Sequence, residues 1–451
     1  MNIKIHRGIG QIGGCITEIS TATSRIFVDM GQNLPGNAEE TTTEQDRAMV
    51  EGFFADNRKQ NEAVFYTHAH EDHVGLFDFV PDSVDQYIGE GGKEILLAKY
   101  DLLKKGHELE LGVGDIVSKH NGSEGQKASC ENLHQILAQD KAKIRHLKSF
   151  KTWERTKPHA RPKSIEVGNI RITPFFNCHS IYDSYMFLIE ADGKRIWHMG
   201  DFREHGYMGK GLMPTLRAYA GNINVLITEG TMLGRNDECI HEREMSRKMT
   251  SVMDAFKYVV VLASATDIER LASIKNAAQV AHKEMYICSG YMNRTMKIFT
   301  KREAELSKGL FAFNPKFISL GNFGQVAKLK KKDFVLVTGV SHKNFVEDLC
   351  EELDPAEVVL IYSSWDGYYK DSIQVMKNPQ YRAFREAFHN VLDIHTSGHA
   401  DHGTIQKVIE TIRPKQAIIG IHKDAGQSLE TLDLSNEMIE KITSQSEISL
   451  D

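Results

Sequence analysis

Residues 67–73, Thr-His-Ala-His-Glu-Asp-His, place three imidazoles and two carboxylates directly after an apolar run. Imidazoles and carboxylates that are buried away from water need hydrogen-bonding or metal partners, and one shared metal ion can partner several of them at once. Alternate side chains of an extended segment point the same way, so His68 and His70 face one position. Asp72 and His73 then turn toward a second position. The spacing therefore favours a site for two metal ions over a solvated polar loop.

The elements that must position such a site are short β-branched or aromatic runs, each ending on a ligand-type residue. Runs of about five residues have the usual length of a buried strand. Ligands gathered at strand ends are what a layered α/β architecture offers a metal site. The runs and the residues that follow them are 25–28 with Asp29, 63–67 with His68, 170–176 with His179, 194–199 with Asp201, 225–228 with Glu229, and 417–421 with His422.

Each remote residue also has an ordinary structural explanation. His179 fits a hydrogen-bonded histidine at a strand end, Asp201 a Gly-Asp turn, and Glu229 a cap of the following segment. His422 fits the surface, because the polar residues 423–424 follow it. Their joint occurrence in this order nevertheless favours the metal site, since several short patterns rarely coincide by chance.

Composition and length set the broad class of protein. The chain has 451 residues, 41% hydrophobic and 26% charged, with a net charge of −6, which is ordinary for a globular protein of two or three folded units. It contains no apolar run of roughly 20 residues, and residues 1–5 do not begin a signal peptide. We therefore expect a cytoplasmic protein without a membrane partner.

The six cysteines are scattered and form no Cys-X-X-Cys pair. This pattern argues against a disulfide framework or a thiolate zinc knuckle. Cys178 precedes His179 and could be read as a nucleophile beside a base, but a small packing residue is the simpler interpretation. The expected ligands are therefore imidazoles and carboxylates, which suit Zn²⁺ and also Mn²⁺.

One stretch of the chain, 141–163, is strongly basic. It holds nine Lys and Arg residues against one acid, Glu154, with Phe150 and Trp153 interleaved. Such a pattern suits a surface that stacks bases beside phosphate contacts, or else a solvated basic loop.

The pattern of apolar and polar residues in the sequence changes near residue 235. From there to about residue 389, apolar runs alternate with helical patterns, which predicts a parallel-sheet domain. We therefore expect an inserted domain, 235–389, between the two parts of a metal-binding domain, 1–234 and 390–451. A further segment, 98–165, is predicted to be polar and partly helical, with breaks at Gly112, Gly114, Gly122 and Gly125.

At this point a family resemblance can be stated. Residues 68–73, with His179 and Asp201 downstream, resemble the HxHxDH…H…D signature of the metallo-β-lactamase fold. The resemblance implies an α/β protein: a metallo-β-lactamase αββα sandwich carrying an inserted parallel-sheet β-CASP domain. It also implies one metal ion held by His68, His70 and His179, a second held by Asp72, His73 and His422, and Asp201 bridging both.

Three later residues resemble motifs of the β-CASP nucleases. Glu229 resembles the acidic motif A, His399 motif B, and His422 motif C. Residues 179–184 and 200–203 are especially similar to ribonuclease J, although the contexts of Glu229 and His422 depart from that pattern. Ribonuclease J also has an additional C-terminal domain, which we do not expect here because the sequence given ends soon after His422.

The resemblance implies a role for His399 beside the scissile phosphate, where an imidazole stabilises an oxyanion or protonates the leaving oxygen. A His399–His402 metal-binding pair is the alternative. Asp29 and Glu229 are expected to orient imidazoles, and Glu71 to face solvent or lie outside the ligands. The remaining candidates, His198, His205, His342 and His395, are expected to be structural.

The expected function is hydrolysis of RNA phosphodiester bonds by a metal-bridging hydroxide, as a 5′ exonuclease, an endonuclease or both. The expected partner is single-stranded RNA, and a homodimer is possible. Loops at 264–267, 338–341 and 363–364 resemble phosphate-binding loops of ribonuclease J-like proteins, or else are ordinary strand–helix connections. Alternatives are a single-stranded DNA nuclease, a hydrolase of a small ester, thioester or lactone, and a non-catalytic binding subunit of the same fold.

Overall fold

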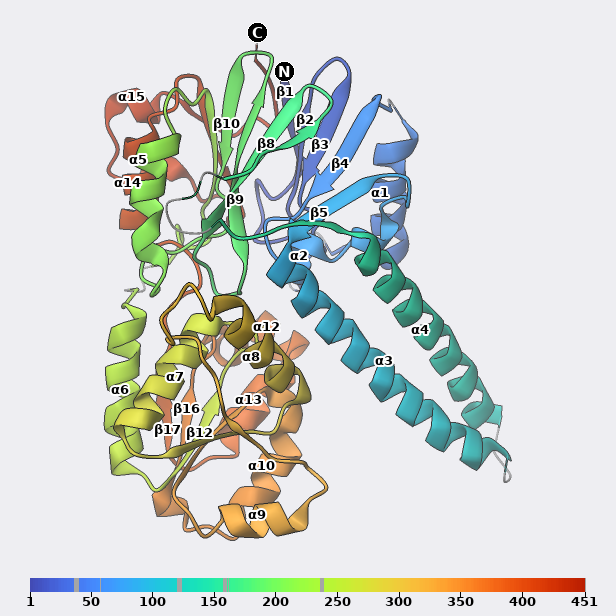
Figure 1. The fold of residues 1–451 in the computed structure, drawn as a ribbon, viewed down its shortest axis with the longest axis vertical. Helices are drawn as coiled ribbons and strands as arrows, with labels where there is room; N and C mark the ends of the chain where they lie inside the picture. Colours follow the sequence, from blue (N-terminus) through green and yellow to red (C-terminus); the bar gives the residue numbers. More distant parts are fainter. Residues whose placement is uncertain are drawn as a thin grey trace.

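We describe the protein from a computed structural model. It describes residues 1–35, 40–56, 58–119, 124–156, 160, 162–235 and 239–450, and for 113–119 and 124–128 the backbone alone. Within these residues the protein is a mixed α/β structure with three β-sheets (Figure 1).

Two of the sheets lie together in the upper half of Figure 1, and each mixes parallel and antiparallel pairs. Among the described residues each has seven strands, in the orders β20-β1-β2-β3-β4-β5-β6 and β19-β18-β11-β10-β9-β8-β7. The first sheet contains β1 Asn2–Arg7, β2 Ile16–Ser20, β3 Ser24–Val28, β4 Asn61–Phe65, β5 Asp85–Gly89, β6 Lys151–Trp153 and β20 Glu447–Ser449. The second contains β7 Ile165–Val167, β8 Ile170–Asn177, β9 Ser184–Ala191, β10 Lys194–His198, β11 Val225–Glu229, β18 Ala417–Ile421 and β19 Ile442–Thr443.

The two sheets pack face to face because their strands are apolar on both sides. Ile26 and Val28 of β3 share a core with Phe187 and Ile227 of the second sheet. Phe27, between them, points to the opposite face, as alternation along a strand requires, and packs among the helices that cover it. The strands are therefore buried on both faces, which explains their nearly continuous apolar sequences.

Helices cover the outer face of each sheet, so the two sheets and their helices form four layers. The first sheet is covered by α1 Thr43–Ala55, α2 Glu71–Val74, and the bases of α3 Glu90–Lys119 and α4 Glu124–Ser149. The second is covered by α5 Leu212–Tyr219, α14 His402–Ile412 and α15 Asn436–Ile439.

The third sheet lies in the lower half of Figure 1, and all its strand pairs are parallel. Its order among the described residues is β14-β13-β15-β12-β16-β17. Its strands are β12 Tyr258–Leu262, β13 Glu284–Ile287, β14 Lys316–Phe317, β15 Phe334–Thr338, β16 Val358–Tyr362 and β17 Val391–Asp393. The parallel sheet predicted from residue 235 onward is confirmed, and its last strand, β17, follows residue 389.

Helices pack on both faces of the parallel sheet, giving it two cores of its own. They are α6 Glu242–Ala255, α7 Ile268–Val280, α8 Gly290–Glu303, α9 Phe323–Leu329, α10 Lys343–Cys350, α11 Gly367–Lys370 and α13 Pro379–Glu386. The short helix α12 Ser372–Lys377 has no buried residue and lies against α11 and α13.

Helices α3 and α4 form a long antiparallel hairpin that extends away from the three sheets (Figure 1). The predicted glycine breaks are wrong here: α3 runs through Gly112 and Gly114, and α4 contains Gly125, while Gly122 lies outside the described residues. A glycine costs a helix about 1 kcal/mol, a penalty that pairing with a second helix along its length outweighs.

The prediction that the aromatic residues of 141–163 form a base-stacking surface is also wrong. Phe150 is buried and stacks on Tyr66, with ring centroids 5.5 Å apart, and Trp153 is buried in the core between the two sheets. Neither ring faces solvent, because the basic residues lie on the outer side of α4 and β6, whose other side packs inward. Lys157 and Arg161 lie outside the described residues.

Among the described helices, none is both long enough and apolar enough to cross a lipid bilayer.

Candidate metal centre

The candidate ligands meet at one end of the two facing sheets, where strands from both sheets finish. His68 and His70 follow β4, and Asp72 and His73 lie in the single turn of the short helix α2. The remaining candidates follow β8, β10 and β18 and are His179, Asp201 and His422. The parallel pairs β3–β4, β10–β11 and β11–β18 bring the carboxyl ends of their strands to the same edge.

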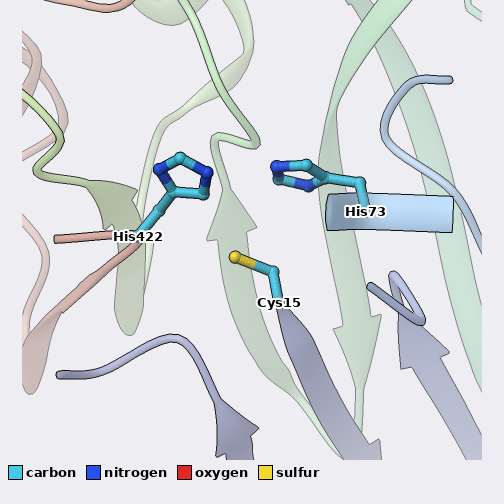
Figure 2. Close-up of side chains that lie close together, drawn as sticks. All are labelled: Cys15, His73 and His422. Atoms are coloured by element: carbon cyan, nitrogen blue, oxygen red, sulfur yellow. The ribbon is translucent and has the colours of Figure 1, made fainter. Parts of the chain in front are cut away.

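His73 and His422 face each other across the centre, with ring centroids 5.2 Å apart (Figure 2). Oδ2 of Asp201 lies 3.1 Å from Nε2 of His73 and 3.5 Å from Nε2 of His422. Oδ2 of Asp72 lies 3.1 Å from the same nitrogen of His422. Two imidazoles and two carboxylates therefore converge on one position.

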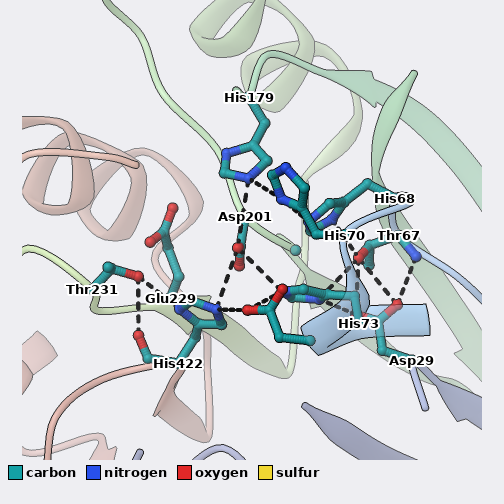
Figure 3. A network of polar contacts seen from close by, with 12 residues as sticks. Asp29, Thr67, His68, His70, His73, His179, Asp201, Glu229, Thr231 and His422 are labelled. Carbon is teal, nitrogen blue, oxygen red and sulfur yellow. Dashed lines mark hydrogen bonds and ion pairs between the residues drawn. The ribbon is translucent and has the colours of Figure 1, made fainter. Parts of the chain in front are cut away.

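A second group, made of His68, His70 and His179, lies beside the first (Figure 3). Nδ1 of His70 is 3.1 Å from Nε2 of His68 and 3.3 Å from Nε2 of His179. Asp201 connects the two groups, because its Oδ2 is also 3.7 Å from Nε2 of His179. The structure thus brings together the seven residues that the family resemblance assigned as metal ligands.

Hydrogen bonds behind the imidazoles set which nitrogen faces the centre. Nδ1 of His179 lies 2.7 Å from the carbonyl oxygen of Gly398, so it must donate its proton there. Nδ1 of His68 lies 3.0 Å from Oγ1 of Thr67, whose hydroxyl in turn donates to Asp29 at 2.8 Å. Both histidines therefore present an unprotonated Nε2 to the centre, as metal ligands with a partner behind them do.

Asp29 holds His73 in the same way. Its Oδ2 accepts a hydrogen bond from Nδ1 of His73 at 2.7 Å, and its Oδ1 accepts one from the backbone N–H of Thr67 at 2.7 Å. Nε2 of His73 is buried and makes no hydrogen bond within the described residues. Once His73 loses its proton, Nε2 offers a lone pair beside Oδ2 of Asp201, so the residues present fit a metal ion.

The charges of the centre fit a cation as well. Burial lowers the pKa of His68 and His179 well below the ordinary value and that of His70 to about 4, so these rings are neutral near pH 7. Burial alone would raise the pKa of Asp72 and Asp201, but the neighbouring His73 and His422 outweigh it and hold both carboxylates ionised.

The pKa values of the two remaining imidazoles, His73 and His422, shift upward instead. Burial lowers the pKa of His73 and His422, but the carboxylates outweigh burial and raise it, with Asp201 the largest of them in both cases. In the metal-free chain a proton therefore neutralises the negative charge of the carboxylates, which is the role that a divalent cation takes when it binds.

Cys15 is a candidate ligand that reasoning from the sequence missed. One ligand atom each of Cys15, His73 and His422 lie within 4.8 Å of one another (Figure 2). The thiol is buried, and burial raises its pKa well above the usual value. The connection between β1 and β2 brings Cys15 to the centre, where its backbone N–H donates to the carbonyl oxygen of Asp72 at 3.0 Å. No spacing pattern in the sequence indicates this approach.

Glu229 and His399 form a pair at the edge of the centre. Oε2 of Glu229 lies 2.8 Å from Nδ1 of His399, and Oε1 accepts a hydrogen bond from the backbone N–H of Phe202 at 2.9 Å. Oγ1 of Thr231 lies 2.7 Å from Nδ1 of His422 and 3.2 Å from Nδ1 of His399. Glu229 and Thr231 therefore orient both imidazoles.

His402 does not join this pair. Its Nε2 lies 3.1 Å from the carbonyl oxygen of Met232, and within the described residues it belongs to no group that could hold a metal ion. These contacts give no support to the alternative of a His399–His402 metal pair.

The backbone that carries His399 is held by three consecutive carbonyl groups. Each accepts a hydrogen bond from a buried arginine or histidine of another segment, which fixes the path of residues 396–398. The contacts are Arg270 Nη2 to Thr396 at 3.2 Å, Arg203 Nη1 and His205 Nε2 to Ser397 at 3.3 and 2.7 Å, and His179 Nδ1 to Gly398 at 2.7 Å.

The centre opens into a groove of about 1230 Å³ between the paired sheets and the parallel sheet. His70 and His399 line its inner end. Further along, its walls carry hydroxyl groups from the strand ends of the parallel sheet and a set of aromatic rings. These residues are Ser264, Thr266, Ser341, Ser363, Ser364, Trp365, Tyr368, Tyr369 and Tyr381.

Other candidates from the sequence lie apart from the centre. Glu71 is partly exposed and pairs with Lys99. The Cys178 thiol is buried and donates to Glu269 at 3.1 Å, and burial raises its pKa well above the usual value, which does not suit a nucleophile. His198 is held in the interior, where burial lowers its pKa to about 4. His395 is exposed and lines the groove, where its Nδ1 lies 3.2 Å from Nη1 of Arg270.

Comparison with known proteins identifies the fold but no family. No family model matches the chain. Among solved structures, a protein of unknown function from Enterococcus faecalis V583 matches with a TM-score of 0.69 at 17% sequence identity, over 100% of this chain and 99% of the other. The two proteins therefore share an architecture along their whole length.

Proposed function

We propose that the protein is a metal-dependent hydrolase of the metallo-β-lactamase fold and β-CASP branch that cleaves phosphodiester bonds of RNA. The observation that carries this proposal is the position of Asp201. Its Oδ2 lies within 3.7 Å of His179 in one candidate ligand group and within 3.1 Å of His73 in the other. One carboxylate shared between two ligand groups is the arrangement that a two-metal hydrolase requires.

The ligand assignment follows from the two groups. His68, His70 and His179 would hold one divalent ion, and Asp72, His73 and His422 the other, with Asp201 contacting both. Two such ions, Zn²⁺ or Mn²⁺, supply an activated water molecule and neutralise charge on the phosphoryl oxygens. Cys15 adds a sulfur atom close to the second position, which favours Zn²⁺ there.

His399 has a role separate from metal binding. It lines the groove and is held by Glu229 through Nδ1, so it can donate a hydrogen bond to charge that develops on a phosphoryl oxygen or give a proton to the leaving oxygen. Glu229 supports this role by fixing the orientation of the ring. His399 is thus the acid–base residue of the proposed reaction.

The groove supports a polymeric substrate. Tyr368 and Tyr381 stack with ring centroids 4.2 Å apart, and the Arg235 guanidinium lies 4.7 Å above the Trp365 ring. Aromatic faces bind the bases of single-stranded nucleic acid regardless of sequence, and hydroxyl and backbone N–H groups at strand ends bind phosphate. A hydrolase of a small ester, thioester or lactone would not need these aromatic and hydroxyl groups along the groove.

An assay on three RNAs tests the proposal. Purified protein loaded with Zn²⁺ or Mn²⁺ is incubated with 5′-monophosphorylated, 5′-triphosphorylated and circular RNA, and the products are separated on a sequencing gel. Loss of only the monophosphorylated linear RNA indicates a 5′ exonuclease, and cutting of the circle indicates an endonuclease. The matched control is Asp72→Asn, which removes one ligand charge. Cleavage of neither RNA nor DNA, together with hydrolysis of a lactone or thioester, would refute the proposal.

A further inference from the structure

A third group of metal-ligating side chains lies outside the candidate centre. It consists of His205, Cys239 and Asp401, which follow β10, precede α6 and precede α14, respectively. One ligand atom of each lies within 4.8 Å of the other two. The group shares no residue with the centre around Asp201, so a metal ion here would be additional to those already considered.

His205 provides an independent indication of a ligand. Its Nε2 lies 2.7 Å from the carbonyl oxygen of Ser397 and must donate to it, which leaves the lone pair on Nδ1. Nδ1 is buried and has no hydrogen-bond partner within the described residues, and the whole side chain is only 8% exposed. A buried polar atom without a partner costs about 1 to 3 kcal/mol, which a cation would recover.

The surroundings of the group match those of a metal site. The carbonyl oxygen behind His205 is the kind of partner that a metal-bound imidazole has on its other nitrogen. Oδ1 of Asp401 accepts a hydrogen bond from the backbone N–H of Thr404 at 2.7 Å, which fixes the carboxylate and leaves Oδ2 available. Cys239 lines the groove, so an ion has a path from solvent.

We propose that His205, Cys239 and Asp401 bind one divalent transition-metal ion, with Zn²⁺ the best fit. An imidazole, a thiolate and a carboxylate form the mixed N, S and O ligand set that Zn²⁺ accepts, and a water molecule completes four-coordination. Tetrahedral ligands around zinc lie roughly 3.5 Å apart, so the three atoms would approach one another by at most about 1.3 Å. This site does not depend on the proposed nuclease function.

The ion would connect three segments that are distant in the sequence. His205 belongs to the paired-sheet part, Cys239 lies where the chain enters the parallel-sheet part, and Asp401 lies on the segment that returns from it. His399 is two residues before Asp401, and His205 already holds the carbonyl of Ser397. The ion is therefore placed to position the His399 segment.

Metal counting tests the site on the full chain. Wild type, Cys239→Ser and Asp401→Asn are loaded with Zn²⁺, dialysed against metal-free buffer, and measured by plasma mass spectrometry, with far-ultraviolet circular dichroism as a check of folding. Asp401→Asn keeps an oxygen to cap α14 but loses the charge. The control is Cys350→Ser in α10, because Cys350 belongs to no candidate metal group in the described residues. We expect both variants to hold one ion fewer than wild type and the control; equal counts in all four proteins overturn the proposal.

Cobalt identifies the sulfur ligand. Co²⁺-loaded wild type should show the near-ultraviolet thiolate-to-Co²⁺ absorption, and Cys239→Ser should lose it or a clear part of it. Cys15→Ser reports separately on the sulfur near His73 and His422. Absorption that is absent in wild type, or that disappears only in Cys15→Ser, overturns the assignment to Cys239. If Cys239→Ser does not fold, Asp401→Asn decides, with an expected loss of Zn²⁺ affinity of about 10-fold or more and no change taken as refutation.

Discussion

Nδ1 of His399 lies 2.8 Å from Oε2 of Glu229, although the two residues are 170 positions apart in the chain. Glu229 is 1% exposed, and its other oxygen is held by the Phe202 backbone, so the carboxylate has a fixed orientation. Glu229 therefore sets the orientation of a groove-facing imidazole.

We expect His399→Ala to lower kcat for RNA cleavage by about 10²- to 10⁴-fold, the usual contribution of a general acid. KM and the number of bound metal ions should change little, because Asp201 and the other ligands remain. Steady-state kinetics and metal counting measure both. The control is His402→Ala, whose ring faces the carbonyl oxygen of Met232. Equal kcat in the two variants would contradict the role of His399.

Asp72→Asn should abolish turnover and reduce the metal content, while the fold survives. Oδ2 of Asp72 lies 3.1 Å from Nε2 of His422, and the amide of asparagine removes the charge without changing the volume. Glu71→Gln is the matched control, since the neighbouring carboxylate is partly exposed and pairs with Lys99. Full activity in Asp72→Asn, or an equal loss in both variants, would remove Asp72 from the ligands.

Asp29→Asn should weaken metal binding by about 10- to 100-fold rather than eliminate it, because Asp29 contacts His73 and not the ion position. Asp29 has a φ of 65°, a conformation that asparagine tolerates, whereas alanine adds roughly 1 kcal/mol of backbone strain. Competition with a metal-sensitive dye measures the affinity. An unchanged affinity in Asp29→Asn would show that the contact with His73 does not support metal binding.

Acid should destabilise the metal-free chain through its buried neutral histidines, and His198 isolates the effect. Burial lowers the pKa of His198 to about 4 in the folded chain, against about 6.5 in the unfolded chain. The unfolded chain therefore binds more protons between these values, so stability falls as the pH falls through this window. His198 should lower the free energy of unfolding by about 2 kcal/mol as the pH falls from about 7.5 to about 5.

Urea unfolding in the presence of a chelator measures this loss, and His198→Asn is the comparison. Asparagine retains an acceptor for the backbone N–H of Gly200, which donates to Nδ1 of His198 at 3.2 Å. The free energy of unfolding of the variant should depend less steeply on pH. Because His73 and His422 are present in both proteins, their opposite shifts cancel in the difference. Parallel pH profiles would refute the prediction.

Tyr368→Ala should weaken binding of single-stranded RNA by about 1 to 3 kcal/mol, the usual contribution of one stacked base. The measurement is fluorescence anisotropy with a short labelled RNA and Asp72→Asn as the background, so that no cleavage occurs. Tyr219→Ala on α5 is the control, because that exposed ring lies outside the groove. Equal affinities would place the RNA elsewhere on the protein.

The strands and their terminal ligands could be predicted because each depends on local sequence. An apolar run of strand length that ends on histidine or aspartate describes β4, β10 and β18 without reference to the rest of the chain. Parallel pairing then gathers such ends at one edge. The seven predicted ligands followed from this rule and from the family resemblance.

What could not be predicted depends on contacts between distant segments. The basic neighbours of Phe150 predict an exposed ring, yet the ring packs inward against Tyr66. Cys15 and His205 carry no motif, and only the three-dimensional fold places them beside other ligands. The helices that pass through Gly112 and Gly114 are likewise stabilised by a partner helix, which local propensity does not register.

The separation between Asp72 and His422 has a consequence for synthesis of the chain. The two side chains are in contact although they are 350 positions apart in the sequence, and β20 pairs with β1. At about 5 to 20 residues per second, a ribosome needs roughly 20 to 70 seconds to proceed from one to the other. During that interval the nascent protein lacks part of the candidate ligand set, so the proposed metal centre can form only after His422 has been translated.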